Sequence, residues 1–223
     1  GYGHLQRMQR YDPAADAYQD LPALPGERHH PLMASDGQHI YVAGGYVGRF
    51  STVTGDNFWR YDPLSDEWEI LADLPGARAA GAAVFLHGRV WIVGGVGVGL
   101  DMQAYDVQSG EWESFPGAVG VPADHMQAVA FENEIWWLGG RDDQTSNEVR
   151  IWNPVTRVWR VGPSLQFRRA GFAARVVQGQ IMVAGGERTE LVPFQLVPSM
   201  ELFASGAAGW VPGPPPPIAV HGT

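Results

Sequence analysis

The sequence predicts an all-β fold built from repeated four-stranded antiparallel sheets, and three recurring features indicate it. A short apolar run ends in two adjacent glycines four times, at steps of 50, 45 and 46 residues. An aromatic residue followed by a small polar or acidic residue comes after each pair of glycines, as in Tyr61-Asp62 and Tyr105-Asp106, and degenerates to Phe203-Ala204 in the last copy. A second aromatic residue lies six positions further on each time. A fixed period of this size marks stacked copies of one supersecondary unit that share a core. The four double glycines are Gly44-Gly45, Gly94-Gly95, Gly139-Gly140 and Gly185-Gly186.

Residues 78–114 illustrate the four strands of one copy. The small apolar run 81–86 predicts a first strand, and the turn signal His87-Gly88 leads into a bulkier, β-branched second strand over 90–93. Residues 102–106 and 111–113 predict the third and fourth strands, and no amphipathic helical period competes. Small side chains in the first strand suit a crowded axis, so the sheets are expected to stand radially, as in a β-propeller.

The signature residues resemble those of the kelch repeat: the double glycine after a strand, the Tyr-Asp pair, the later tryptophan and a Leu-Pro-Gly-x-Arg stretch at 24–28 and 74–78. The resemblance covers essentially the whole chain. It implies a kelch-type propeller with about five blades visible, within a ring of six or seven blades; the alternative is a five-bladed ring that closes by pairing its terminal strands. The signature glycines, tyrosines, aspartates and tryptophans are expected to be structural, with the aspartates binding turn amides.

Residues 1–223 are expected to form this single domain. Its divisions are a partial blade over 1–25, whole repeats over about 26–75, 76–120, 121–164 and 165–214, and the start of a further strand over 215–223.

The composition argues against several classes of partner and of chemical site. The net charge of −9 argues against the phosphate backbone of a nucleic acid. All 15 basic residues are arginine, which excludes lysine chemistry, and the absence of cysteine excludes thiolate sites and disulfides. No run approaches the length of a membrane helix, so no membrane insertion is expected. We expect a monomer, and the compartment stays open between cytoplasmic and extracytoplasmic.

Function is expected on the face that carries the connections between strands 2 and 3 and between strand 4 and the next strand 1, because these vary in length while the other turns are short. Loops on a rigid scaffold carry binding residues. The wider set of polar residues on this face contains His29, Tyr46 and Asp124. The candidate ligand-binding residues are Arg28, His30, Arg49, Arg78, Asp101, His125, Arg141, Asp142, Arg169, Glu187 and Arg188.

Three of these candidates, Arg28, Arg78 and Arg169, each fall ten residues after the reference aromatic. They predict a partial ring of arginines that binds carboxylates; the alternative is that each pairs with an adjacent loop acceptor. On the first interpretation, Arg78→Ala and Arg169→Ala weaken binding and leave the melting temperature nearly unchanged. His30 and His125 occupy equivalent positions, but one intervening blade is expected to separate them too far for a metal, so no metal is predicted.

The predicted function is a binding scaffold that recognises a protein, peptide or glycan at the mouth of the propeller. The alternative implied by the resemblance is a carbohydrate-active enzyme similar to the kelch-like sialic acid mutarotases, which need only placed arginine and acidic groups. Copper-radical oxidases of this fold need a cysteine that this chain lacks, and no cofactor is expected. The chain is most similar in organisation to a bacterial stand-alone or modular propeller.

Overall fold

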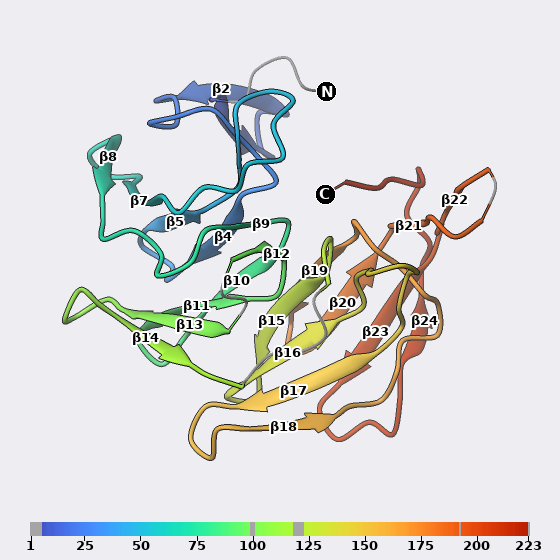
Figure 1. Cartoon of the computed structure of the whole chain (residues 1–223). Coiled ribbons are helices and arrows are strands. Elements are labelled where there is room, and N and C mark those ends of the chain that lie inside the picture. The colour runs from blue at the N-terminus through green and yellow to red at the C-terminus, as the bar shows by residue number, and fades with distance from the viewer. Residues whose placement is uncertain (1–5, 99–100, 118–122, 192, 223) are drawn as a thin grey trace.

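A computed structural model describes residues 6–98, 101–117, 123–191 and 193–222. Within these ranges every regular element is a β-strand, and no helix is long and apolar enough to cross a membrane. The first five residues of the predicted partial blade and the predicted boundary near residue 120 lie outside this description. Four antiparallel four-stranded sheets form the body of the molecule, each with its strands in chain order (Figure 1). The predicted all-β propeller of four-stranded antiparallel blades is therefore confirmed.

The strands of the blades, from the axis outward, have the following bounds. The first blade holds β4 (Leu32–Ser35), β5 (Ile40–Ala43), β7 (Phe58–Asp62) and β8 (Glu67–Ile70). The second holds β10 (Ala82–Leu86), β11 (Arg89–Val93), β13 (Met102–Asp106) and β14 (Glu111–Phe115). The third holds β15 (Gln127–Phe131), β16 (Glu134–Leu138), β17 (Val149–Asn153) and β18 (Val158–Val161). The fourth holds β19 (Ala173–Val177), β20 (Gln180–Ala184), β23 (Met200–Ala204) and β24 (Val211–Gly213).

The remaining strands form two-stranded ladders. β1 (Met8–Asp12) pairs with β2 (Ala17–Leu21) in a sheet of its own among the described residues. Three short ladders fasten the connections on one face: β3 (Arg28–His29) with β6 (Tyr46–Val47), β9 (Arg78–Ala79) with β12 (Val96–Gly97), and β21 (Glu187–Arg188) with β22 (Gln195–Leu196). We call this face the mouth.

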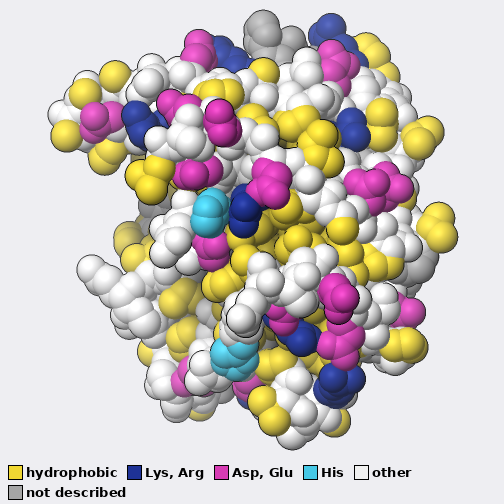
Figure 2. All heavy atoms as spheres, turned by 90° about the vertical axis from the view of Figure 1, so that its left-hand side faces the viewer, with side chains coloured by type: hydrophobic (Ala, Val, Ile, Leu, Met, Phe, Trp, Pro, Cys, Tyr) yellow, Lys and Arg dark blue, Asp and Glu magenta, His cyan; other side chains and the backbone are white. Residues whose placement is uncertain are grey.

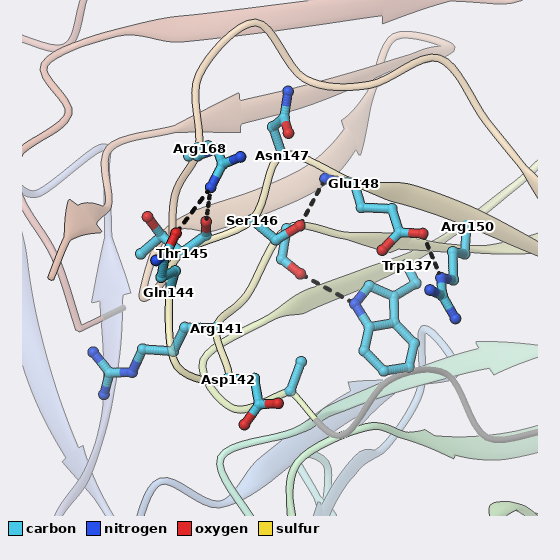
Figure 3. Close-up of a pocket in the computed structure, with 12 residues that line it drawn as sticks. Trp137, Arg141, Asp142, Gln144, Thr145, Ser146, Asn147, Glu148, Arg150 and Arg168 are labelled. Carbon is cyan, nitrogen blue, oxygen red and sulfur yellow. Dashed lines mark hydrogen bonds and ion pairs between the residues drawn. The ribbon is translucent and has the colours of Figure 1, made fainter. Parts of the chain in front are cut away.

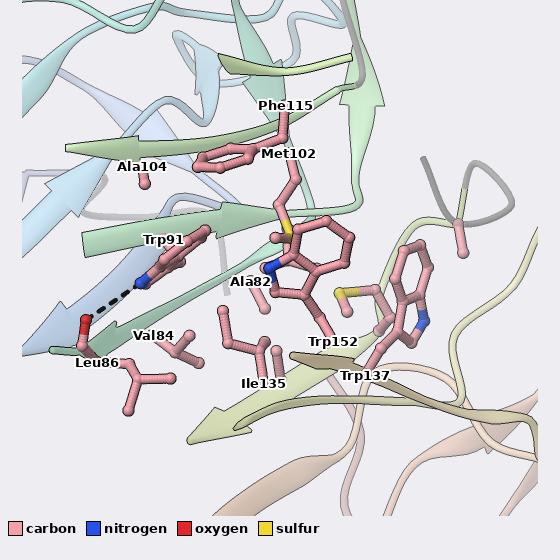
Figure 4. Packing of buried hydrophobic residues seen from close by; sticks show 14 residues of the cluster. Ala82, Val84, Leu86, Trp91, Met102, Ala104, Phe115, Ile135, Trp137 and Trp152 are labelled. Atoms are coloured by element: carbon pink, nitrogen blue, oxygen red, sulfur yellow. Dashed lines mark hydrogen bonds between the residues drawn. The ribbon is translucent and has the colours of Figure 1, made fainter. Parts of the chain in front are cut away.

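The first strands β4, β10, β15 and β19 lie next to one another in that order, and the sheets fan out from them (Figure 1). Strand side chains alternate between the two faces of a sheet, so each blade packs on both neighbours. Val90 and Ile92 of β11 pack toward the first blade in a cluster with Tyr41. Trp91 of the same strand faces the third blade in the cluster that contains Trp152 (Figure 4).

Three tryptophans fasten the first, second and fourth blades to the connection that precedes each of them. Trp68, Trp112 and Trp210 donate their indole N–H to main-chain carbonyls of the preceding connection, at 3.2, 2.8 and 2.7 Å. Asp62 and Asp106 accept hydrogen bonds from main-chain N–H groups of the turns that follow them, as predicted.

The double glycines seat each blade on the next. Gly139 has a φ of 52°, and a Cβ there would lie 2.8 Å from the carbonyl oxygen of Arg169. Gly140 donates its N–H to that same carbonyl at 3.0 Å. Any larger residue at Gly139 would push the two connections apart, which explains why the pattern requires glycine.

A chain of main-chain hydrogen bonds runs from blade to blade around the mouth. Ala80 N–H donates to His30 O, His125 to Ala80 O, Gly171 to His125 O, and Gly222 to Gly171 O, over 2.8 to 3.0 Å. All five residues have positive φ, between 53° and 72°. Successive blades therefore present equivalent residues at one height, and the segment before Gly222 continues the series.

Candidate functional site

The mouth contains a cavity of about 760 Å³. Met33 and Met126 contribute apolar surface, and most of the remaining lining side chains are polar or ionisable. These polar side chains are His29, His30, His125, Gln127, Arg141, Glu187 and His221. On the side of the molecule shown in Figure 2, hydrophobic side chains gather in a central hollow, and acidic and basic side chains alternate around it. The view shows no continuous basic surface on that side.

Histidines of the first and third blades meet at the mouth. The rings of His30 and His125 are 4.9 Å apart in an edge-to-face arrangement, and the Nδ1 atoms of His29 and His30 are 2.7 Å apart. Tyr46 packs on His29 with ring centroids at 4.9 Å. The expectation that one intervening blade keeps His30 and His125 far apart is wrong, because both residues have a left-handed backbone conformation that turns the side chain toward the axis.

Burial lowers the pKa of His30 to about 4, and the neighbouring His125 and His29 act in the same direction. His30 is therefore neutral near pH 7. Within the described ranges no group of three histidine, aspartate or glutamate side chains has an arrangement that would hold a metal ion.

Arg141 is the central ion of this cluster. Its Nε donates to Asp124 Oδ1 at 2.8 Å and its Nη1 to Glu187 Oε1 at 2.7 Å, while Nη2 lies 3.2 Å from His125 Nδ1. The other oxygen of Glu187 contacts His221 Nδ1 at 2.9 Å. Burial acts to raise the pKa of Asp124, but the hydrogen bonds and charges of His125 and Arg141 outweigh it, and the pKa is lowered. The network holds groups from the third and fourth blades and the final segment in one rigid arrangement.

The predicted ring of accessible arginines is not present. Arg78 and Arg169 have no exposed surface. Arg78 donates to the carbonyls of Gly94 and Asp101 at 3.2 and 2.8 Å, inside its own blade. Its guanidinium is buried against the carbonyl of Gly94, the first residue of the double glycine, and burial lowers its pKa to about 10.

Arg169 is held in the same way and by a carboxylate as well. It donates to Gly185 O at 2.7 Å and to Ser199 Oγ at 2.8 Å. It forms a 2.6 Å ion pair with Glu201, which is also fully buried. Arg28, the third member, is partly exposed; it donates to Asn57 Oδ1 at 2.6 Å and lies over the Trp59 ring at 5.1 Å. The alternative interpretation, in which each arginine has a loop acceptor, describes all three.

The other candidate residues lie outside the histidine cluster. Arg49 is exposed and its guanidinium lies 5.2 Å from the Phe50 ring. Arg188 donates to Glu190 at 3.0 Å. Asp101 uses its carboxylate to accept from Gly117 N–H at 3.2 Å, and Asp142 lies exposed in the connection after β16.

The structure brings together His30, His125, Arg141 and Glu187 from the candidate set. It adds His29, Tyr46 and Asp124, which the wider set contained. His221 was not predicted. Its signal was present, because His221-Gly222 takes the place in the series of mouth hydrogen bonds that Ala170-Gly171 holds one repeat earlier and His29-His30 four repeats earlier.

Comparison with known proteins agrees with this geometry. The Kelch motif family matches residues 27–75 and 124–166. The Kelch-like protein terF of Aspergillus terreus is 27% identical over 124 residues, which cover 54% of this chain and 27% of that protein. Alpha-scruin of Limulus polyphemus is 26% identical and covers 90% of this chain and 24% of its own length. The Kelch repeat protein M-T8 of Myxoma virus is 26% identical, over 82% of this chain and 36% of its own length.

The chain thus spans between about a quarter and about a third of the length of these relatives. They are eukaryotic or viral and give no support to the bacterial organisation expected from the sequence. The four blades and the two matched motifs show that this chain contains kelch repeats.

Proposed function

We propose that this chain is a protein-interaction module that binds a peptide segment of a partner protein in the mouth cavity. The kelch-repeat relatives support an interaction scaffold. The observation that carries the proposal is the cavity of about 760 Å³, which polar groups from several connections line together with apolar surface. Its volume lies within the range of about 300–1,000 Å³ that ligand sites of proteins commonly have.

Two exposed aromatic residues border the cavity and offer contacts for a partner. Phe50 is 81% exposed and stands next to Ser51, whose carbonyl contacts His29 at 3.1 Å. Phe194 is 53% exposed and packs on His221 at 5.6 Å. Aromatic side chains that surround a cavity commonly supply most of the binding energy of an interface. A peptide lying across the mouth would contact both.

The rigidity of the polar cluster favours binding over a mobile catalytic role. Arg141 already has two carboxylate partners, and His30 is neutral and hydrogen-bonded to its neighbour. Groups fixed in this way recognise a ligand without being reorganised, which lowers the cost of binding.

The test is selection of binding peptides from a displayed random library on the full chain, followed by fluorescence anisotropy. The double variant Phe50→Ala/Phe194→Ala and the single variant His125→Ala are each expected to weaken binding about tenfold or more. His87→Ala, in a turn on the opposite face, is the matched control and is expected to leave the Kd unchanged.

Two outcomes would refute the proposal. One is a selected peptide that binds equally well to the mouth variants. The other is binding of glycans on an array without any peptide ligand, followed by anomeric or hydrolytic change in NMR spectra, which would favour the carbohydrate-active alternative.

A further inference from the structure

One position in the repeat holds arginine in three blades and alanine in the third blade. It is identified by its main-chain carbonyl, which accepts the N–H of the second glycine of the blade before it. These hydrogen bonds, of 2.9, 2.9 and 3.0 Å, run from Gly45 to Arg78, from Gly95 to Ala123 and from Gly140 to Arg169. Arg28 occupies the same position in the first blade by sequence spacing. We call the space that this side chain fills the arginine slot.

In the second and fourth blades the slot arginine donates to the first glycine of its own double glycine, at 3.2 Å to Gly94 O and 2.7 Å to Gly185 O. The third blade meets the same need in another way. The indole N–H of Trp137 donates to Gly139 O at 3.2 Å. Trp137 therefore supplies one of the hydrogen bonds that an arginine would make, and the Gly139 carbonyl has a donor although the arginine is missing.

The rest of the arginine slot is open in the third blade. A cavity of about 240 Å³ is lined by Ala123, Trp137 and Gly139, together with Glu148 and Arg150 (Figure 3). Glu148 stands where Ser199 accepts from the slot arginine of the fourth blade, four residues before the repeat aromatic, and Arg150 stands where Glu201 pairs with that arginine. The third blade thus keeps one side-chain acceptor, Glu148, at a position that holds the slot guanidinium in the fourth blade.

The charges around the cavity leave room for a cation. Glu148 and Arg150 form a 2.8 Å ion pair and neutralise each other. Asp142 lies at the rim (Figure 3). Arg168 is exposed, where solvent screens its charge, and its Nη1 is 3.4 Å from Thr145 O. Arg141 also lines the cavity, but its guanidinium points away to its partners in the mouth.

We propose that this open arginine slot binds an arginine side chain of the partner, whose guanidinium takes the place of the missing slot arginine. The proposal rests on the proposed function, since it names one contact that the partner peptide makes beside the mouth. A planar guanidinium suits the slot better than an ammonium, because its donors spread in a fixed fork and its face packs on aromatic rings. Arg28 is an example in this chain: partly exposed, it lies over Trp59 and donates to Asn57.

The experiment uses N-acetyl-arginine-N-methylamide as the probe and the indole N–H signal of Trp137, identified by its loss in Trp137→Phe, as the readout in ¹H–¹⁵N spectra. A saturable shift with a Kd of about 1 mM is expected for one capped residue. The matching citrulline and lysine compounds are expected to bind at least about threefold more weakly. The glutamate compound is expected to give no saturable shift.

Variants test whether the arginine compound binds in the open arginine slot of the third blade. Ala123→Arg fills the slot from within and is expected to abolish the shift; circular dichroism checks that it folds. Asp142→Asn keeps the cavity and is expected to weaken binding about threefold, while Asp143→Asn, at the neighbouring residue that does not line the cavity, is the control.

The proposal is overturned if no saturable shift appears up to about 30 mM probe, if the glutamate or citrulline compound binds as well as the arginine compound, or if folded Ala123→Arg keeps the wild-type affinity. Failure here is distinct from failure of the proposed function, because peptides selected on the mouth would still bind and still depend on Phe50, Phe194 and His125.

Discussion

Replacing Glu201 with glutamine is expected to lower the free energy of unfolding by about 3 kcal/mol. Glu201 and Arg169 are both fully buried and form a 2.6 Å ion pair. The same carboxylate also accepts from the main-chain N–H groups of Gln166 at 2.6 Å and Phe167 at 3.3 Å. Glutamine keeps the shape and one acceptor oxygen but removes the charge that balances a buried guanidinium. Breaking a buried pair from one side costs about 3–5 kcal/mol, and the retained acceptor places this change at the lower end.

The assay is urea unfolding followed by tryptophan fluorescence, with thermal unfolding beside it. For a chain of 223 residues, an unfolding entropy of about 2.1 cal/mol/K per residue converts this loss into a fall in Tm of about 6 °C. Arg168→Ala is the matched control, since Arg168 is the exposed neighbour, and it is expected to change stability by less than about 0.5 kcal/mol.

A double variant separates the effect of the two buried charges from the effect of the volume that the two side chains fill. Arg169→Met/Glu201→Leu buries no charge and is expected to be more stable than Glu201→Gln. If the free energy of unfolding of Glu201→Gln lies within about 0.5 kcal/mol of the wild-type value, the conclusion that this ion pair holds the fourth blade together is refuted.

Three further changes test other parts of the structure. The unfolded pKa of His30 is near 6.5 and its folded pKa is about 4, so between these values the unfolded state binds more protons than the folded state. The contribution of His30 to the free energy of unfolding is fully present above pH 6.5, and the free energy is expected to fall by about 2 kcal/mol toward pH 4, after allowance for partial exposure. Urea titration is expected to show a less steep fall in His30→Gln. Gly44→Ala places a Cβ 2.2 Å from the carbonyl of Arg78 and is expected to cost more than about 3 kcal/mol, whereas Gly37→Ala, also at positive φ but in open space, is expected to cost about 1 kcal/mol. Trp112→Phe loses a 2.8 Å hydrogen bond to the preceding blade and is expected to lower stability by about 1 kcal/mol in the same assay.

The fold was predictable because the features that build a blade are local in the sequence. The double glycines, the acidic residues of the turns and the alternation within strands each constrain a few neighbouring residues. The second blade accordingly has strands at 82–86, 89–93, 102–106 and 111–115, within two residues of the predicted bounds. No long-range information was needed to obtain them.

The candidate site was predictable only in part, because spacing identifies equivalent positions and not the direction of a side chain. His30 and His125 were correctly paired as equivalents, and both reach the mouth. Arg78 and Arg169 are equally good equivalents, yet they lie two residues earlier and point into the blade. Two residues separate a left-handed position at the axis from a buried one. Sequence spacing alone does not distinguish these environments.

Departures from the repeat therefore carry more functional information than the repeat itself. In the second and fourth blades the slot arginine donates to the carbonyl of the first glycine, and this role leaves its guanidinium buried. Ala123 departs from the pattern in the same blade in which Trp137 supplies the missing donor, so the two changes compensate in structure. They do not compensate in volume, because a cavity of about 240 Å³ remains. Trp137 restores the hydrogen bond but leaves a side-chain-sized space, and for this reason we propose that the third blade accepts the missing side chain from a partner.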